Sequence, residues 1–442
     1  MSFDSLGLRA ELLQTIHKAG YTTASPIQAA AIPVILKGKD VMASAETGTG
    51  KTAAFTLPML DLLSATESRG KPRVRALVLT PTRELAGQVN DSVVKYGRGL
   101  SIQSTPIYGG VSMTAQFKAL RRGVDILVAT PGRLIDHLER GSIDLSAVEF
   151  IVLDEADRML DMGFAPAMER IFRAIPKKRQ TLLFSATFSS TIRGLAGSYL
   201  SNPEEVSVAK PNATAKNITQ TAYKVDNDRK TDLLAHLFDQ HDLEQVLVFT
   251  RTKRGADRLA KQLDGKGIRA AAIHGDKSQG QRNRALAMFK KNKVRTLVAT
   301  DVAARGIDIN QLSHVVNYEL PDDIENYVHR IGRTGRAGKK GTAISLIGNH
   351  EFSRLREIEK LIKSRIQTDT LEGFEPKHAP VREAADPAKR RRNTGGFKKK
   401  AQYRDKQEST GSSYRPRRGD GKAATGNKKR RTFSGQQNRS AA

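Results

Sequence analysis

A segment near the N-terminus has the residue types and spacing of a phosphate-binding loop. It reads Ala45-Glu46-Thr47-Gly48-Thr49-Gly50-Lys51-Thr52. The glycines let backbone N–H groups face a phosphate, the lysine brings positive charge to the β- and γ-phosphates, and the last threonine offers a hydroxyl to Mg²⁺. The strict pattern has glycine where this chain has Ala45, so a plain glycine-rich turn is the alternative. The intact Gly-Lys-Thr ending after an apolar run favours a site for ATP and Mg²⁺.

An acidic tetrapeptide, Asp154-Glu155-Ala156-Asp157, follows a second apolar run. A carboxylate at the end of a parallel strand is well placed to hold Mg²⁺, so we expect Asp154 to do so directly or through water. The adjacent Glu155 can orient and deprotonate an attacking water. Alone, such a tetrapeptide is more often a solvated helix start. Its place after an apolar strand favours catalysis.

A cluster of arginines in the second half of the chain can supply the positive charge that phosphoryl transfer needs. Arg330, Arg333 and Arg336 recur at every third position. We expect a helical turn to present them on one side. A surface salt-bridge face is the alternative, but the intervening glycines disfavour it. Because these arginines belong to the second half, hydrolysis would require the two halves to close.

These residues need strands to position them. Apolar runs alternate with helical patterns, as expected for parallel strands buried on both faces and joined by right-handed βαβ units. The first series of runs comprises residues 40–43, 76–80, 125–130, 150–154 and 181–185. The second comprises residues 245–250, 270–274, 295–300, 314–318 and 342–347. The sequence therefore predicts an α/β fold with two tandem parallel-sheet domains.

A short internal repeat supports duplication, because the sequence Leu-Val-Ala-Thr occurs at residues 127–130 and again at 297–300. Polar residues and prolines place the boundary near residues 201–216. We expect an N-terminal segment over residues 1–29, an ATP-binding domain over 30–205, a second domain over 212–372 and a tail over 373–442.

The net charge of +28 predicts a polyanionic partner, with nucleic acid the first candidate and an anionic membrane the second. More than half of it lies in residues 377–442, which hold 20 Lys and Arg against 5 Asp and Glu. This Lys- and Arg-rich tail is too polar to fold, so we expect it to be disordered. The chain has no cysteine, no long apolar run and no signal-peptide pattern, so we expect a cytoplasmic protein without a membrane partner.

The motifs, taken in order, resemble the DEAD-box family of superfamily 2 helicases from Phe3 to about Gly341. The family's phosphate loop, AxTGxGKT, accepts Ala45. The other matching segments are Phe3 with Gly20-Tyr21 and Ser25-Pro26-Ile27-Gln28, residues 81–86, Gly109-Gly110, residues 130–133, 154–157 and 185–187, Val248-Phe249-Thr250, Gln279 with Arg282, Thr300-Asp301, residues 305–308 and residues 329–336. One departure is Ser25, which stands where the family often has threonine and keeps the hydroxyl.

The resemblance implies two RecA-like domains and an RNA-stimulated ATPase that acts as an RNA helicase, with ATP and Mg²⁺ as cofactors. Gln28 would read the adenine edge, since an amide offers both a donor and an acceptor. Tyr21 would stack on the base, and Asp308 would contact the ribose. The implied catalytic set is Lys51, Asp154, Glu155, Arg333 and Arg336, with Thr52 and Asp154 on Mg²⁺. The implied ATP-binding set is Tyr21, Gln28, Ala45, Glu46, Thr47, Gly48, Thr49, Gly50, Lys51, Thr52, Gly306 and Asp308.

The resemblance also implies an RNA path along the sugar-phosphate backbone, with little sequence specificity. Ser185, Thr187 and Asp157 would couple it to the ATP site. Its implied members are Pro81, Arg83, Gly110, Thr130, Arg133, Arg282 and Thr300. Family members pry short duplexes apart, and the short core with a basic tail is similar to the bacterial RhlE subgroup. We expect a monomer that acts on ribosomal precursors or in RNA decay.

Two other functions remain open at the level of sequence. A DNA translocase of the wider superfamily would be stimulated by single-stranded DNA as strongly as by RNA. A non-catalytic RNA clamp is disfavoured by the intact catalytic candidates Lys51, Glu155, Arg333 and Arg336. The basic tail is predicted to tether RNA without specificity, and a nuclear localisation signal at residues 389–392 or 428–431 is the rival interpretation.

Overall fold

Two parallel β-sheets organise the computed structural model, which describes residues 1–45, 48–66, 72–186, 188–208, 218–241, 243–304, 307, 309, 312–335 and 340–377. Each sheet has seven strands. Neighbouring strands are parallel throughout both sheets as described. The predicted fold class, two tandem parallel-sheet α/β domains, is confirmed.

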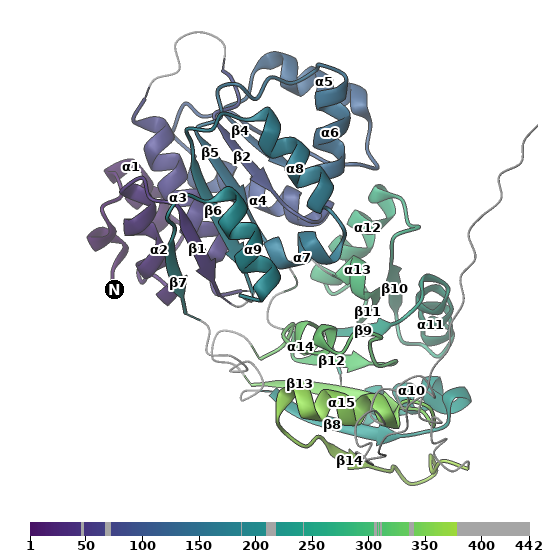
Figure 1. The fold of residues 1–442 in the computed structure, drawn as a ribbon. Coiled ribbons are helices and arrows are strands. Elements are labelled where there is room, and N and C mark those ends of the chain that lie inside the picture. Colours follow the sequence, from purple (N-terminus) through teal and green to yellow (C-terminus); the bar gives the residue numbers. More distant parts are fainter. Residues whose placement is uncertain are drawn as a thin grey trace, which may run out of the picture. The chain divides into compact units, whose positions relative to one another are not determined.

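The first sheet has the strand order β3-β4-β2-β5-β6-β1-β7. Its strands are β1 (Val41–Ser44), β2 (Ala76–Leu79), β3 (Ser104–Ile107), β4 (Ile126–Ala129), β5 (Phe150–Leu153), β6 (Gln180–Ser185) and β7 (Glu204–Ser207). The accompanying helices are η1 (Phe3–Leu6), α1 (Ala10–Lys18), α2 (Pro26–Leu36), α3 (Lys51–Ser64), α4 (Arg83–Tyr96), α5 (Met113–Arg122), α6 (Pro131–Glu139), α7 (Ala156–Asp161), α8 (Ala165–Ala174) and α9 (Ser190–Tyr199) (Figure 1).

Both faces of this sheet are buried in hydrophobic clusters. Val41 packs with Phe55 of α3 in the cluster that also takes in α1, α2 and α4. Met42, the next residue, enters the opposite cluster with Ile171 of α8 and residues of α6, α7 and α9. Successive side chains of a strand point to opposite faces, so a strand covered on both sides must be apolar at every position. This explains the continuous apolar runs of the sequence.

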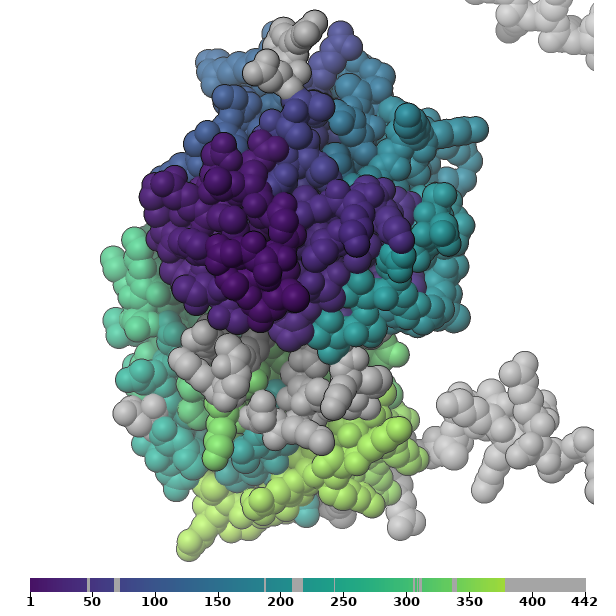
Figure 2. All heavy atoms as spheres, turned by 90° about the vertical axis from the view of Figure 1, so that its left-hand side faces the viewer, coloured from purple at the N-terminus to yellow at the C-terminus, as the bar shows by residue number. Residues whose placement is uncertain are grey.

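The N-terminal segment packs onto this half of the chain. Phe3, Leu6 and Leu12 are buried in the same cluster as Val41. Figure 2 shows the segment (purple) spread over the outer surface of the half that contains the first sheet. The segment therefore extends the first hydrophobic core and ends at α2, close to the phosphate-binding loop.

The second sheet has the strand order β10-β11-β9-β12-β13-β8-β14. Its strands are β8 (Ile218–Lys224), β9 (Val246–Thr250), β10 (Ala270–Ile273), β11 (Thr296–Thr300), β12 (His314–Asn317), β13 (Gly341–Ile347) and β14 (Gln367–Asp369). Its helices are η3 (Asn227–Arg229), α10 (Lys230–Gln240), α11 (Lys253–Gly265), α12 (Gln279–Lys290), α13 (Asp301–Ala304), α14 (Glu325–Ile331) and α15 (Phe352–Ile362).

The two sheets have the same topology. Each strand of the second order corresponds to the strand seven numbers lower in the first order. The repeated Leu-Val-Ala-Thr segment ends β4 in one sheet and β11 in the other, and these strands occupy equivalent positions. The internal repeat is therefore matched by a structural repeat. Only the first of the two equivalent strands β1 and β8 leads into a Gly-Lys-Thr loop.

All ten predicted strands are present, with ends that shift by one residue at most positions. Four strands were not predicted, namely β3, β7, β8 and β14. The predicted domain limits stay predictions, and the predicted tail lies outside the described residues from 378 onward. Among the described helices, none has the length and apolar character needed to cross a membrane.

Candidate functional site

The phosphate-binding loop joins β1 to α3 at the carboxyl edge of the first sheet. Gly48 and Gly50 adopt positive φ angles of 87° and 93°, which favour glycine. Lys51 begins α3 and is only 7% exposed. Its ammonium group donates to the carbonyl oxygen of Ala45 at 2.7 Å, across the base of the loop. The loop thus places a buried cation and a helix N-terminus where a phosphate would bind.

Gln28 links the N-terminal segment to this loop. Its Oε1 accepts from the backbone N of Ser25 at 2.9 Å, and its Nε2 donates to the carbonyl of Gly50 at 3.1 Å. A Cβ on Gly50 would lie 2.4 Å from that nitrogen, so only glycine permits the approach. An amide offers two N–H groups and two lone pairs, so one of each is left for a nucleobase edge.

Tyr21 lies on the surface near the end of α4. It is 44% exposed, and the ammonium of Lys95 lies 4.9 Å from its ring centre. Burial and the neighbouring Tyr21 raise the pKa of Tyr96 to about 12. An exposed aromatic face of this kind can stack on a base.

Asp154 and Glu155 follow β5 and are buried at 3% and 7% exposure. Burial, with Glu155 beside it, raises the pKa of Asp154 to about 7. Burial also acts to raise the pKa of Glu155, but the charges of Arg158, Lys51 and Arg333 outweigh it and lower that pKa to about 2. Glu155 has a positive φ of 54°, a costly conformation for a side chain of this kind. The environment therefore shifts the pKa values of two adjacent carboxyl groups in opposite directions, up for Asp154 and down for Glu155.

Asp157 connects the acidic segment to the end of β6. Its Oδ2 accepts from the backbone N of Ala186 at 3.0 Å. Ser185, buried at the end of β6, lies in register with Ser44 of β1, and its carbonyl accepts from the N of Ala45 at 3.2 Å. Hydrogen bonds to backbone atoms therefore connect the acidic segment to the end of β6, and the end of β6 to the start of the phosphate-binding loop. One pocket is lined by Lys51, Glu155, Asp157, Arg158, Asp161, Ala186 and His329.

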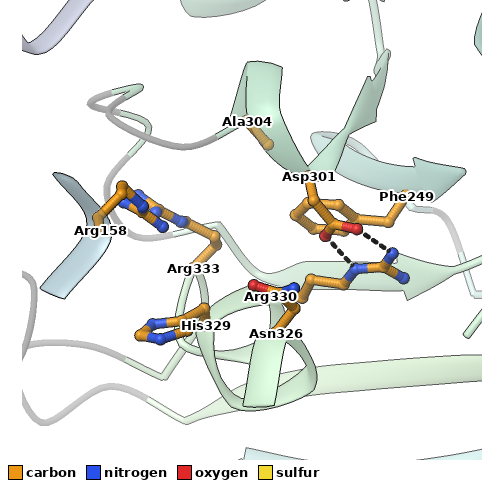
Figure 3. Close-up of a pocket in the computed structure, with 8 residues that line it drawn as sticks. All are labelled: Arg158, Phe249, Asp301, Ala304, Asn326, His329, Arg330 and Arg333. Carbon is orange, nitrogen blue, oxygen red and sulfur yellow. Dashed lines mark hydrogen bonds and ion pairs between the residues drawn. The ribbon is translucent and has the colours of Figure 1, made fainter. Parts of the chain in front are cut away.

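The arginine motif differs from its prediction. Helix α14 ends at Ile331, so Arg330 and Arg333 do not share one helical turn. Arg330 is buried within its own half and donates to both carboxylate oxygens of Asp301, at 2.6 and 2.7 Å (Figure 3). Arg333 lies past the helix end and lines a pocket together with Arg158 (Figure 3). Gly332 follows α14 and ends the helix between Arg330 and Arg333. Arg330 forms its ion pair with Asp301 instead.

Three residues predicted to contact RNA lie together on the first half. A Cβ on Gly110 would come within 1.9 Å of Arg83 Nη1, so the guanidinium lies against the glycine backbone. A Cβ on Gly109 would lie 3.7 Å from Arg83 and 3.9 Å from Arg133. Arg133 Nη1 also donates to the carbonyl of Val111 at 3.3 Å. Two guanidinium groups therefore border one glycine turn, an arrangement suited to phosphate oxygens. Pro81 and Thr130 are buried at the ends of the adjacent β2 and β4 segments.

Arg282 belongs to α12 of the second half and contacts the first half. Its Nε donates to Glu84 Oε1 at 2.7 Å, and Nε2 of Gln279 donates to the same oxygen at 2.9 Å. Both halves belong to one compact unit, Met1–Glu383. Glu84 follows Arg83 directly, so this buried ion pair brings Arg282 to the first turn of α4. Thr300 ends β11 and is 7% exposed.

Several predicted site residues lie outside the described residues. They are Glu46, Thr47, Thr187, Gly306, Asp308 and Arg336. Their predicted roles stay predictions.

The residues expected around Mg²⁺ carry oxygen donors. The Thr52 hydroxyl and the Asp154 carboxylate are hard ligands of the kind Mg²⁺ prefers, supplemented by phosphates and water. Among the described residues, no group of three or more His, Cys, Asp or Glu side chains could hold a metal ion by itself. The donor set therefore fits a metal that arrives with a nucleotide.

Sequence reasoning did not single out Arg158 and Glu84. The three-residue spacing from Glu155 to Arg158 in a helical segment could have indicated the ion pair that they form. No sequence signal could have paired Glu84 with Arg282, because these residues are 198 positions apart.

Comparisons with known proteins agree with these motifs. The DEAD/DEAH box helicase family matches residues 25–195, and the helicase conserved C-terminal domain matches residues 229–338. RhpA of Helicobacter pylori, a DEAD-box ATP-dependent RNA helicase, is 44% identical over 366 residues, 83% of this chain and 73% of RhpA. CshA of Geobacillus kaustophilus, which carries the same description, is 45% identical over 83% of this chain and 78% of CshA.

A solved structure gives the same result for the fold. S. cerevisiae Dbp5 bound to RNA and ADP BeF3 aligns with a TM-score of 0.73 and 33% identity, over 85% of this chain and 95% of that chain. The sequence motifs, the duplicated sheets and these matches lead to one conclusion. The chain belongs to the DEAD-box family of ATP-dependent RNA helicases.

Proposed function

We propose that this protein couples ATP binding and hydrolysis to closure of its two sheet-containing halves on RNA. Closure would unwind short duplexes or remodel RNA–protein complexes. The observation that carries the proposal is the pocket in which Lys51 and Glu155 of the first half meet His329 of the second. A nucleotide bound beside Lys51 would then be sensed by both halves.

Within this proposal the charged side chains have distinct roles. Lys51 binds the β- and γ-phosphates, Glu155 orients the attacking water, and Arg333 and Arg336 stabilise charge on the transferred phosphoryl group. Mg²⁺ held by Thr52 and Asp154 would neutralise phosphate charge when bound. Gln28 selects the adenine and Tyr21 stacks on it. The remaining residues of the phosphate-binding loop, together with Gly306 and Asp308, would complete the ATP site.

RNA would bind through the positions already brought together. Arg83, Gly110 and Arg133 border one turn, and Pro81, Thr130, Arg282 and Thr300 would extend the path. Dbp5, solved with both RNA and a nucleotide, supports a shared arrangement of the two ligands. The contact of Asp157 with Ala186 supports coupling through Ser185 and Thr187. Ribosome assembly or RNA decay is the proposed setting, with the protein acting as a monomer of the RhlE subgroup.

Strand separation of a short fluorescent RNA duplex tests the proposal. The wild-type chain should separate the duplex when ATP is present. Glu155→Gln should bind ATP and RNA but turn over ATP about 10² to 10⁴ times more slowly, the usual loss for a general base. A single-stranded DNA of the same length should stimulate ATP hydrolysis far less than RNA. Equal stimulation by DNA would contradict the proposal in favour of a DNA translocase.

A further inference from the structure

A buried polar chain connects the Gly109-Gly110 turn to helix α6. Nε2 of Gln116, on α5, donates to the carbonyl of Tyr108 at 2.9 Å, immediately before the turn. Oε1 of the same side chain lies 3.2 Å from Nε2 of His137 on α6. Gln116 is 7% exposed and His137 is fully buried. Neither residue belongs to the ATP or RNA motifs.

The hydrogen-bond directions in this chain follow from its chemistry. A carbonyl can only accept, so the Gln116 amide nitrogen faces Tyr108 and its oxygen faces His137. His137 Nε2 must therefore donate. Its Nδ1 lies 2.8 Å from the hydroxyl of Ser142, whose one proton can be donated either to this nitrogen or to the carbonyl of His137 at 2.9 Å. Burial, followed by the charge of Arg133, lowers the pKa of His137 and favours that neutral form.

Packing holds the same two helices together. The ring of Phe117, next to Gln116 on α5, meets His137 edge-on at 5.1 Å. Buried polar groups that are fully paired fix one geometry, because any displacement leaves a donor or acceptor unsatisfied. The turn and α6 are therefore held at one separation.

The hydrogen-bonded link from Tyr108 through Gln116 to His137 has a residue of the proposed RNA path near each of its two ends. Arg133 lies one helical turn before His137 on α6, and its guanidinium reaches the carbonyl of Val111 just after the turn. The turn itself lies against Arg83. The separation of turn and helix thus sets where one guanidinium lies relative to the other.

We propose that Gln116 and His137 are positioning residues for RNA binding: their buried link holds the Gly109-Gly110 turn and Arg133 at the spacing that successive RNA phosphates require. The inference rests on the proposed RNA path. Neither side chain contacts RNA. Phosphate contacts depend on the placement of the donors, and a site held about 1 Å too loosely loses much of its function.

The test measures the RNA concentration that gives half-maximal stimulation of ATP hydrolysis. Gln116→Met and His137→Phe each break the link while keeping side-chain volume. Each should raise that concentration roughly 5- to 10-fold, the effect of losing about one buried hydrogen bond. ATP affinity and turnover at saturating RNA should stay near wild type. The amide of His137→Gln can still donate to Gln116, so this variant should show a smaller rise in the half-maximal RNA concentration than His137→Phe.

Gln180→Met is the matched control. Gln180 is an equally buried glutamine whose Nε2 donates to the carbonyls of Ile35 and Lys39, at the opposite end of the first sheet from the motifs. The Gln180→Met variant should have a lower melting temperature and an unchanged half-maximal RNA concentration. An equal rise in Gln180→Met would assign the effect to general destabilisation and overturn the inference.

Arg133→Ala separates this inference from the proposed RNA path. If Arg133→Ala raises the RNA concentration and the Gln116 and His137 variants do not, the link has no positioning role. If Arg133→Ala has no effect, the proposed path itself is wrong. Should a single variant fail to fold, the double variant Gln116→Met with His137→Phe removes both polar side chains at once. Neither the glutamine nor the histidine is then buried without the other, and the RNA concentration for half-maximal stimulation should rise as in the single variants.

Discussion

Arg158 donates to the carboxylate of Glu155 at 2.6 Å, and the two side chains are only 8% and 9% exposed. Glu155 is the group proposed to orient the attacking water, so its charge is held by a neighbour one helical turn away. Together with Lys51 and Arg333, Arg158 keeps Glu155 ionised while Asp154 beside it has a raised pKa. The ion pair therefore belongs to the construction of the site, although no motif includes Arg158.

Replacing Arg158 should expose this dependence. Arg158→Met leaves a buried carboxylate without its partner, which typically costs about 3–5 kcal/mol of stability. Thermal unfolding should show a lower melting temperature for Arg158→Met, and the double variant with Glu155→Gln should recover most of it. The exposed i,i+4 pair of Arg173 with Glu169 provides the control, since Arg173→Met should change the melting temperature little. A double variant as unstable as Arg158→Met would contradict the assignment.

Gln28 should control the choice of nucleotide. Its amide is fixed by Ser25 and Gly50, which leaves one donor and one acceptor for the base. Gln28→Leu should raise the KM for ATP and reduce the preference for ATP over GTP by about 10-fold or more, because the paired edge is lost. Steady-state kinetics with both nucleotides at saturating RNA measure this. An unchanged ATP-to-GTP ratio would remove Gln28 from base recognition.

The buried His137 should make stability sensitive to acid. Its pKa is lowered below 6.5 by burial and by Arg133 and Arg140, with Asp136 acting in the opposite direction. The unfolded chain then binds a proton more readily than the folded chain. The contribution that the neutral His137 makes to stability is present in full above pH 6.5 and is lost as the pH falls below that value. His137→Phe should show a smaller drop in melting temperature than wild type between pH 7.5 and the acidic side of 6.5. Parallel curves would show that folding does not lower the pKa of His137.

The segment after Lys377 should strengthen RNA binding without affecting the ATP site. Its clustered lysines and arginines can neutralise several phosphates and release counterions. Deleting residues 378–442 should raise the RNA concentration for half-maximal stimulation and flatten its dependence on salt, with basal ATP hydrolysis unchanged. A deletion variant with the wild-type salt slope would show that the basic residues do not bind RNA.

The fold was largely predictable because the central strands are apolar on both faces. The missed strands lack this signal: β7 is made of Glu204, Glu205, Val206 and Ser207 and is mostly exposed, and β3 contains Pro106 at a sheet edge. Strand β8 mixes threonine, glutamine and lysine with apolar residues, so its pattern resembles a loop. Edge and half-exposed strands are defined by their neighbours rather than by their own sequence.

The site was predictable where function rests on backbone conformation and sequence-local groups. Gly48, Gly50 and Lys51 show their chemistry in their order along the chain. The partners of side chains were less predictable, because they depend on where the chain returns. Arg330 pairs with Asp301, and Gln28 donates to Gly50. Such pairings arise from tertiary packing, which residue spacing alone does not contain.

ATP and RNA together should close the two halves on each other. Because the chain has no cysteine, Lys178→Cys and Lys261→Cys, both at exposed positions, can carry a donor and an acceptor dye, one in each half. Single-molecule energy transfer should shift to one new, distinct population only when RNA and a non-hydrolysable ATP analogue are both present, and Lys51→Ala should abolish the shift. The same transfer distribution with and without both ligands would contradict the account.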